Sequence, residues 1–162
     1  MLLLRFYKLI LLLFIFYSLP GQQTGNPMPG AYSTRSYVHL LKDKKVALVV
    51  NHTSVILKTH LADSLLASGI QVTKIFAPEH GFRGSADAGA HVDDSVDQKT
   101  GLRIVSLYGT HKKPNQEDFK NVEMVVFDIQ DVGVRFYTYS STLHYVMEAC
   151  AENKVPLLIL DR

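Results

Sequence analysis

The feature that most constrains the fold is a series of short apolar runs, each of which ends in polar residues. Strands that are buried on both faces of a parallel sheet have this near-continuous apolar character, whereas half-exposed strands alternate. The runs therefore predict an α/β fold with a mostly parallel sheet that is covered by helices on its faces. The five runs are Lys45–Val50, Gln71–Phe76, Arg103–Leu107, Val122–Phe127 and Val155–Leu160.

Two stretches between the runs have the spacing of amphipathic helices. The first is predicted to end at Gly69, a residue type that commonly stops helices. Its leucines on one face are Leu57, Leu61, Leu65 and Leu66. The second helix is predicted over Tyr139–Glu152, and we expect its core face to be formed by Leu143, Val146, Met147 and Cys150.

The N-terminal residues are typical of a secretory signal peptide. Arg5 and Lys8 precede the apolar run 9–17, which is shorter than the roughly 20 apolar residues that a membrane-spanning helix needs. We therefore expect a signal peptide at 1–21, a linker at 22–35 and a periplasmic or secreted protein with no stable membrane association after cleavage. An uncleaved membrane anchor is the alternative. The folded domain is expected at 36–162, and we expect it to be truncated, because the chain stops just after the fifth apolar run.

Composition excludes several classes of function. The formal net charge is +2, and two of the positive residues lie in the predicted signal peptide, so no basic surface for nucleic acid is expected. The single cysteine, Cys150, excludes an internal disulfide and is expected to be a buried helix residue.

Polar residues follow the predicted strands, and this indicates where a site would form. Ligands of parallel sheets bind in the crevice beyond the carboxyl ends of the strands. Asn51 follows the first run, and the loop 77–84 with Glu79, His80 and Arg83 follows the second. The position of Glu79 suits a general acid for glycosidic cleavage. A structural ion pair between Glu79 and Arg83 is the alternative.

The segment 127–139 is rich in carboxylate, amide, guanidinium and phenol groups, a mixture that suits sugar hydroxyls and rings. Its candidate ligand-binding residues are Asp128, Gln130, Asp131, Arg135 and Tyr137. An arginine such as Arg135 could bind a ligand carboxylate bidentately. Alternatively, Asp128 or Asp131 caps the helix that follows.

The sequence predicts neither a metal nor an organic cofactor. The seven histidines lack the spacing of metal sites, and no glycine-rich dinucleotide motif or P-loop is present. A metal site assembled from His52, His80 and Asp128 is the alternative, which would make the protein a metal-dependent hydrolase.

In these motifs the chain resembles the exo-β-N-acetylmuramidases, a family of peptidoglycan-recycling glycosidases. The matching stretches cover most of Val46–Arg162 in the family's order, with Glu-His-Gly-Phe-Arg-Gly at 79–84 and Asp-Ile-Gln-Asp-Val-Gly-x-Arg-Phe-Tyr-Thr-Tyr at 128–139 as the most specific motifs. The resemblance implies a Rossmann-like N-terminal domain, a smaller C-terminal domain and an active site between them. The Pro-Asn-Pro motif that continues the family pattern after Arg162 is absent.

The resemblance also implies roles for individual residues. Glu79 is expected to be the main catalytic carboxyl group, and Asp128 or Asp131 the second one that glycoside hydrolysis usually needs. The expected substrate-binding residues are Asn51, His80, Arg83, Gln130, Arg135 and Tyr137. The expected ligands are muramyl saccharides from peptidoglycan, whose lactyl carboxylate Arg83 or Arg135 would bind. No cofactor is expected, and a muramyl-sugar binding module without catalysis is the alternative.

Overall fold

The computed structural model describes residues 28–84 and 94–161. The predicted signal peptide at 1–21 and residues 22–27 of the predicted linker lie outside the described residues, as does Arg162. Within the described ranges, no helix is long and apolar enough to cross a membrane.

The core of the molecule is a six-stranded sheet with the strand order β5-β6-β4-β1-β7-β8. All neighbouring strands pair in parallel except β5, which pairs antiparallel with β6. This arrangement confirms the predicted α/β fold with a mostly parallel sheet. The strands are β1 (Lys45–Val50), β4 (Gln71–Ala77), β5 (Ser95–Val96), β6 (Arg103–Ser106), β7 (Met124–Asp128) and β8 (Leu157–Ile159).

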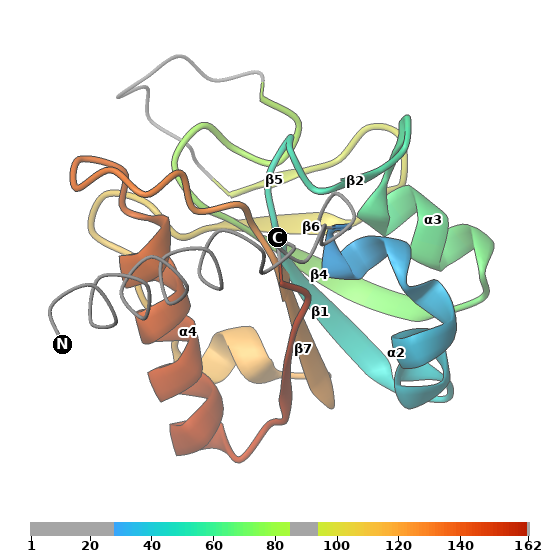
Figure 1. Ribbon diagram of the computed structural model, residues 1–162. Helices are drawn as coiled ribbons and strands as arrows, with labels where there is room; N and C mark the ends of the chain where they lie inside the picture. The colour runs from blue at the N-terminus through green and yellow to red at the C-terminus, as the bar shows by residue number, and fades with distance from the viewer. Residues whose placement is uncertain (1–27, 85–93, 162) are drawn as a thin grey trace, which may run out of the picture.

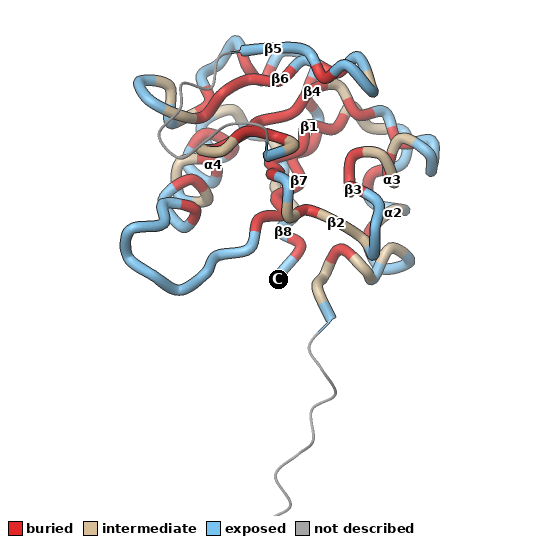
Figure 2. The backbone as a smooth tube through the Cα atoms, turned by 90° about the horizontal axis from the view of Figure 1, so that it is seen from above, coloured by how far each residue is buried: buried red, intermediate tan, exposed pale blue. Residues whose placement is uncertain are grey.

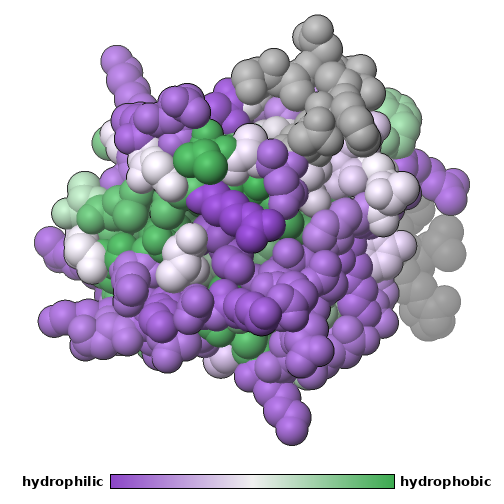
Figure 3. Space-filling model, turned by 180° about the vertical axis from the view of Figure 1, so that it is seen from behind, coloured by the Kyte–Doolittle hydropathy of each residue, from purple (hydrophilic) through white to green (hydrophobic). Residues whose placement is uncertain are grey.

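Helices cover both faces of the sheet (Figure 1). One face packs against α2 (Thr34–Leu41) and α3 (Leu61–Ala67), and the other against α4 (Tyr139–Asn153) and the 3-10 helix η2 (Gln116–Phe119). The central strand β1 supplies side chains to both cores alternately, as a strand must when its successive side chains point to opposite faces. Buried residues therefore run along the strands (Figure 2), while polar side chains cover most of the face shown in Figure 3.

The first predicted helix begins later than its leucine spacing indicated. Leu57 is not helical; it lies between the short antiparallel strands β2 (Val55–Ile56) and β3 (Thr59–His60), with a positive φ of 55° and 75% exposure. The helix begins at Leu61, because the His60 side chain caps it by accepting a hydrogen bond from the Ala62 N–H. It ends before Gly69, as predicted, and Gly69 has a φ of 77°.

The predicted core face of α4 was wrong at one position. Met147 is 50% exposed, whereas Val146 and Cys150 are buried as expected. Ala149 is buried beside them, because the helix turns a stripe through 146, 149 and 150 toward the sheet.

Part of the stretch predicted as a linker is folded. Residues Gly30–Tyr32 form the 3-10 helix η1, Ala31 is fully buried, and α2 begins at Thr34. The Gly30 N–H donates to the Asp161 carbonyl, and a Cβ at position 30 would lie 2.9 Å from the Asp161 nitrogen. The absence of a side chain at Gly30 therefore lets this segment pack against the end of the chain's last described strand.

The strand registers bring the predicted site residues to one edge of the sheet. Val50 pairs with Asp128, and Ala77 pairs with Ser106, so the segments that follow β1, β4, β6 and β7 leave the sheet together. The Leu107 N–H continues this pattern by donating to the Ala77 carbonyl at 2.8 Å.

Candidate functional site

Asn51 holds the turn that follows β1. Its side-chain oxygen accepts hydrogen bonds from the Thr53 N–H at 2.9 Å and the Thr53 hydroxyl at 2.7 Å. Its carbonyl accepts from His60 Nε2 at 2.9 Å, since His60 Nδ1 already accepts from the helix. The amide nitrogen Nδ2 is buried and makes no hydrogen bond within the described part of the chain. Asn51 is fully buried, and its side-chain hydrogen bonds stabilise this turn.

The loop that carries Glu79 has an unusual backbone. His80 has a φ of 71° and Gly81 a φ of 73°, so two successive residues adopt the left-handed region. This conformation is costly for a residue other than glycine and is often found at functional sites. Phe82 anchors the loop: it is 3% exposed and packs edge-on against the buried His60 ring, with 4.6 Å between the ring centroids.

Arg83 fastens the same loop through two carboxylates. Its Nε and Nη2 donate side-on to the two carboxylate oxygens of Asp97, both at 2.8 Å, and Nη2 also lies 3.1 Å from Asp63 Oδ1. Lys99 joins the cluster at 2.6 Å from Asp63 Oδ2. The expected alternative of an ion pair between Glu79 and Arg83 is therefore wrong, because Asp63 and Asp97 occupy the guanidinium.

These contacts shift the pKa values of the cluster. The hydrogen bonds from Arg83 hold the pKa of Asp97 well below its usual range, against burial, which would raise it. Burial would also raise the pKa of Asp63, but hydrogen bonds from Arg83 and Lys99 outweigh it and lower the value. Both carboxylates are therefore ionised at neutral pH. Arg83 forms ion pairs with both of them, so a ligand anion would have to compete with two carboxylates.

Glu79 lines a pocket of about 330 Å³ between the loop after β6 and the first turns of α4. We call it the Glu79 pocket; its other lining residues are Leu107, Tyr108, Lys112, Thr138, Ser141, Thr142 and Tyr145. The charge of Glu79, with burial and a hydrogen bond between the two side chains, raises the pKa of the Tyr108 phenol. The pocket thus combines one carboxylate, one ammonium group and several hydroxyls, a set of groups that suits a sugar.

His80, Gln130 and Tyr137 line a second, more open pocket of about 550 Å³, together with His52, Thr53, Val132 and Tyr139. The structure therefore brings these three predicted residues together, beside the Glu79 pocket rather than inside it. Residues 130–138 form an exposed loop between β7 and α4 (Figure 2), and Arg135 lies on it outside both pockets. Tyr137 packs between Phe136 and Tyr139, with ring centroids 5.9 Å from each.

The two predicted aspartates lie apart from Glu79. Asp128 is fully buried at the end of β7, and its carbonyl accepts a hydrogen bond from the Ser54 hydroxyl. Asp131 is exposed and lines a third pocket of about 240 Å³, with Asp161 and the start of α4. Neither aspartate caps α4, whose N-cap residue is Thr138. The catalytic and binding roles of the predicted site residues stay predictions.

Among residues 28–84 and 94–161, no group of three or more histidine, cysteine or carboxylate side chains lies close enough to hold a metal ion. His52 and His80 line one pocket, but Asp128 lies below the surface and is not among its lining residues. The described residues therefore do not form the alternative metal site of His52, His80 and Asp128.

Sequence reasoning missed several residues of the Glu79 pocket. Ser141 and Tyr145 are one helical turn apart on α4, and Thr138 and Thr142 show the same i, i+4 spacing. This polar stripe was visible in the sequence, but only the apolar face of the helix was used to predict its role. Lys112 carried no signal, because a lysine in a polar loop is common at any surface.

Two solved structures are similar to the chain along most of its length. Both are crystal structures of DUF1343 family proteins from Bacteroides fragilis NCTC 9343, with a TM-score of 0.72 in each case and 42% and 35% sequence identity. Each match covers 83% of this chain and 34% of the other chain. The shared fold is therefore that of about a third of these longer proteins.

A curated relative is "Peptidoglycan beta-N-acetylmuramidase NamZ" from Bacillus subtilis (strain 168), which is 46% identical over 128 residues. The match covers 78% of this chain and 31% of the relative, so the chain spans about a third of that protein. The family described as "Exo-beta-N-acetylmuramidase NamZ, N-terminal" matches residues 46–162, which include the Glu79 loop, the exposed loop and the lining residues of the three pockets described above. The chain therefore belongs to the NamZ exo-β-N-acetylmuramidase family, in the N-terminal region of that family.

Proposed function

We propose that the protein is a glycoside hydrolase that releases N-acetylmuramic acid from the non-reducing end of peptidoglycan fragments. The observation that carries this proposal is the 46% identity to a protein named as a peptidoglycan β-N-acetylmuramidase, over a region that contains the Glu79 loop. The hydroxyl-rich Glu79 pocket supports it, since sugars are bound through hydroxyl and carboxylate hydrogen bonds. The predicted muramyl ligands are part of this proposal.

In this mechanism Glu79 is the main catalytic carboxyl group. The backbone after β4 places it at the edge of the sheet, where it lines a pocket and stays partly exposed to an incoming sugar. As a general acid it would protonate the glycosidic oxygen as the bond to the sugar breaks. The charge of Glu79 raises the pKa of the Tyr108 phenol, so the neutral hydroxyl of Tyr108 stays available in the same pocket as the carboxyl group.

The second carboxyl group of the mechanism is proposed from the described residues outside the Glu79 pocket. Among the described residues that line this pocket, Glu79 is the one carboxylate. Asp131, which is exposed, is better placed to meet solvent or substrate than Asp128, which is buried. We therefore propose Asp131 before Asp128 as the chain's own candidate for the second carboxyl group.

The test uses a chromogenic N-acetylmuramide and the full-length protein. Glu79→Gln should lower kcat by roughly 10²–10⁴-fold, the usual contribution of a general acid, with an unchanged circular dichroism spectrum. Glu148→Gln is the matched control, because Glu148 is an exposed carboxylate on α4 outside the pocket. Full activity of Glu79→Gln would remove Glu79 from the mechanism. Binding of N-acetylmuramic acid by the wild-type protein without turnover would favour a sugar-binding module instead.

We also propose that the protein acts in the periplasm or outside the cell. Support comes from the charge and apolar pattern of residues 1–21 and from the extracytoplasmic location of peptidoglycan. Fractionation with N-terminal sequencing of the mature protein tests this, and recovery of uncleaved protein in the cytoplasm would refute it.

A further inference from the structure

The Glu79 pocket contains one described positive charge, that of Lys112. Lys112 is exposed and lies in the loop after β6, so its ammonium group is at the rim of the pocket whose wall holds Glu79. It makes no ion pair with any carboxylate in the described ranges, Glu79 included. A cation at the rim of a pocket, with no anion of its own, is suited to bind an anionic ligand group.

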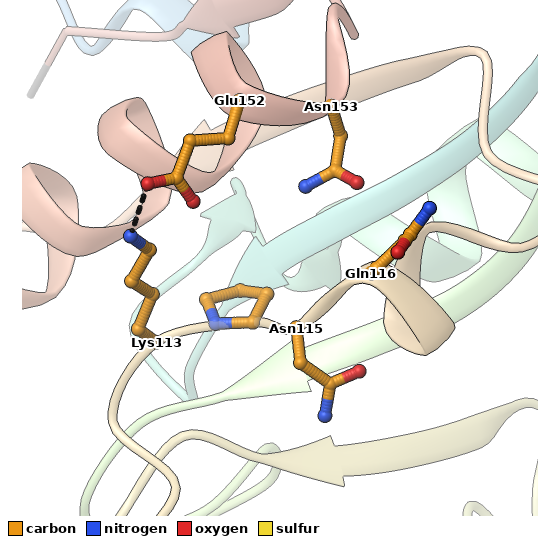
Figure 4. A pocket seen from close by; sticks show the side chains of 6 residues that line it. Lys113, Asn115, Gln116, Glu152 and Asn153 are labelled. Carbon is orange, nitrogen blue, oxygen red and sulfur yellow. Dashed lines mark hydrogen bonds and ion pairs between the residues drawn. The ribbon is translucent and has the colours of Figure 1, made fainter.

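The adjacent lysine shows the opposite situation. Lys113 lies 2.8 Å from Glu152 and 3.1 Å from Glu148, and Figure 4 shows the first of these contacts. These two carboxylates of α4 raise the pKa of Lys113, chiefly through the hydrogen bond that Lys113 donates to Glu152. Both acidic residues of α4 therefore bind Lys113, while Lys112 lines the Glu79 pocket.

The two arginines that the sequence favoured for a ligand carboxylate are placed less well. Arg83 already binds Asp63 and Asp97, so a third anion would have to compete with two carboxylates. Arg135 is on the exposed loop 130–138 and does not line the Glu79 pocket. Of the three cations, Lys112 is the one that lies with Glu79 in a single pocket.

We propose that Lys112 is a specificity-determining residue that binds the carboxylate of an acidic amino sugar held in the Glu79 pocket. This inference rests on the proposed function for the identity of the sugar, whose lactyl ether carries the carboxylate. The pocket volume of about 330 Å³ is at the lower end of the roughly 300–1,000 Å³ found for small-molecule sites, which suits a single sugar unit. The hydroxyls of Ser141 and Tyr145 are available to the neutral part of the sugar.

Titration calorimetry of the full-length protein tests the proposal with N-acetylmuramic acid and its methyl ester as probes. The wild-type protein should bind the free acid about tenfold more tightly than the ester, because one charge-assisted contact is lost in the ester. Lys112→Met should abolish this preference and leave binding of the ester unchanged, whereas Lys112→Arg should restore it. The wild-type preference should also weaken at high salt, since the contact is near the surface.

Lys113→Met is the matched control, because it removes a charge at the next position without touching the pocket. It should keep the preference for the free acid. A preference that survives Lys112→Met, is absent from the wild type, or is lost equally in Lys113→Met overturns the proposal.

The assay separates this inference from the proposed function. If the wild-type protein cleaves the chromogenic muramide but Lys112→Met keeps the preference for the free acid, the inference about Lys112 fails alone. If the preference depends on Lys112 but no muramide is cleaved, the proposed activity fails and the carboxylate site stands.

Discussion

Replacing Arg83 with methionine should lower the free energy of unfolding by about 3 kcal/mol. The methionine replaces the aliphatic part of the arginine side chain with an unbranched apolar one and removes the guanidinium. Asp97 then loses a side-on pair of hydrogen bonds, both at 2.8 Å, and keeps the hydrogen bonds from the Thr100 N–H and hydroxyl. Asp63 loses its contact at 3.1 Å and keeps Lys99.

The magnitude follows from the burial of the two partners. Removing one partner of a buried ion pair costs about 3–5 kcal/mol, whereas an exposed pair contributes about 0–1 kcal/mol. The Asp97 side chain is 7% exposed and the Arg83 side chain 30% exposed. The Arg83–Asp97 pair is therefore closer to the buried case, but solvent reaches the guanidinium and the remaining partners compensate in part. These two effects place the cost at the low end of the buried range.

Urea unfolding followed by circular dichroism measures this cost. At a slope of about 2 kcal/mol per molar urea, a loss of about 3 kcal/mol moves the midpoint down by about 1.5 M. Lys120→Met is the control: the Lys120 and Glu117 side chains are 69% and 72% exposed, and the shift should stay below about 0.5 M.

The stability that Arg83 contributes should also depend on pH, in a direction that follows from the pKa of Asp97. Arg83 lowers the pKa of Asp97, so the unfolded state binds more protons as the pH falls below the ordinary value of 3.8. The stability that Arg83 contributes is therefore fully present above about pH 5 and decreases toward pH 3. A difference between wild type and variant below 1 kcal/mol at pH 7, or one that grows as the pH falls, would refute the assigned role of this cluster.

Three further predictions concern the same region and the opposite core. Burial lowers the pKa of His60 from 6.5, so stability should fall as the pH drops below about 6.5, and His60→Gln should flatten this dependence in urea midpoints measured between pH 8 and 5. Gly84→Ala should cost more stability than Gly133→Ala, by about 1–2 kcal/mol, because both glycines have φ near 70° but a Cβ at Gly84 would lie 3.0 Å from His52; equal midpoints would contradict this. Burial raises the pKa of Cys150 to about 11, so Ellman's reagent should modify it in denaturant but not in the native protein at pH 8.

The sequence predicted the sheet well for a physical reason. Strands such as Lys45–Val50 are covered on both faces, so nearly every residue must be apolar, and a run of this kind is visible without knowledge of its neighbours. Leu57 misled the helix prediction, because leucine spacing alone does not reveal that a hairpin turn with positive φ precedes the helix. The prediction that Met147 is buried was wrong for a similar reason. Helical spacing allows several adjacent stripes of side chains, and packing selects which stripe faces the core.

The candidate site was predicted in part. The rule that strand ends meet at one edge placed Glu79, His80 and Gln130 in the same region, and the structure has them around neighbouring pockets. The partners of Arg83 could not be predicted, because Asp63 and Asp97 lie 20 and 14 positions away in the sequence and reach it only through the folded loops. Pairing between distant side chains depends on loop geometry that no local pattern encodes.

The position of β1 in the centre of the sheet has a consequence for how the chain folds during synthesis. β1 pairs with β4, which follows closely, but its other neighbour is β7, and the contact between Lys45 and Glu123 joins residues 78 positions apart. At about 5–20 residues per second, β1 waits roughly 4–16 s for this second neighbour. Throughout that interval the apolar strand β1 has an open hydrogen-bonding edge, which can pair with other chains until β7 closes the sheet.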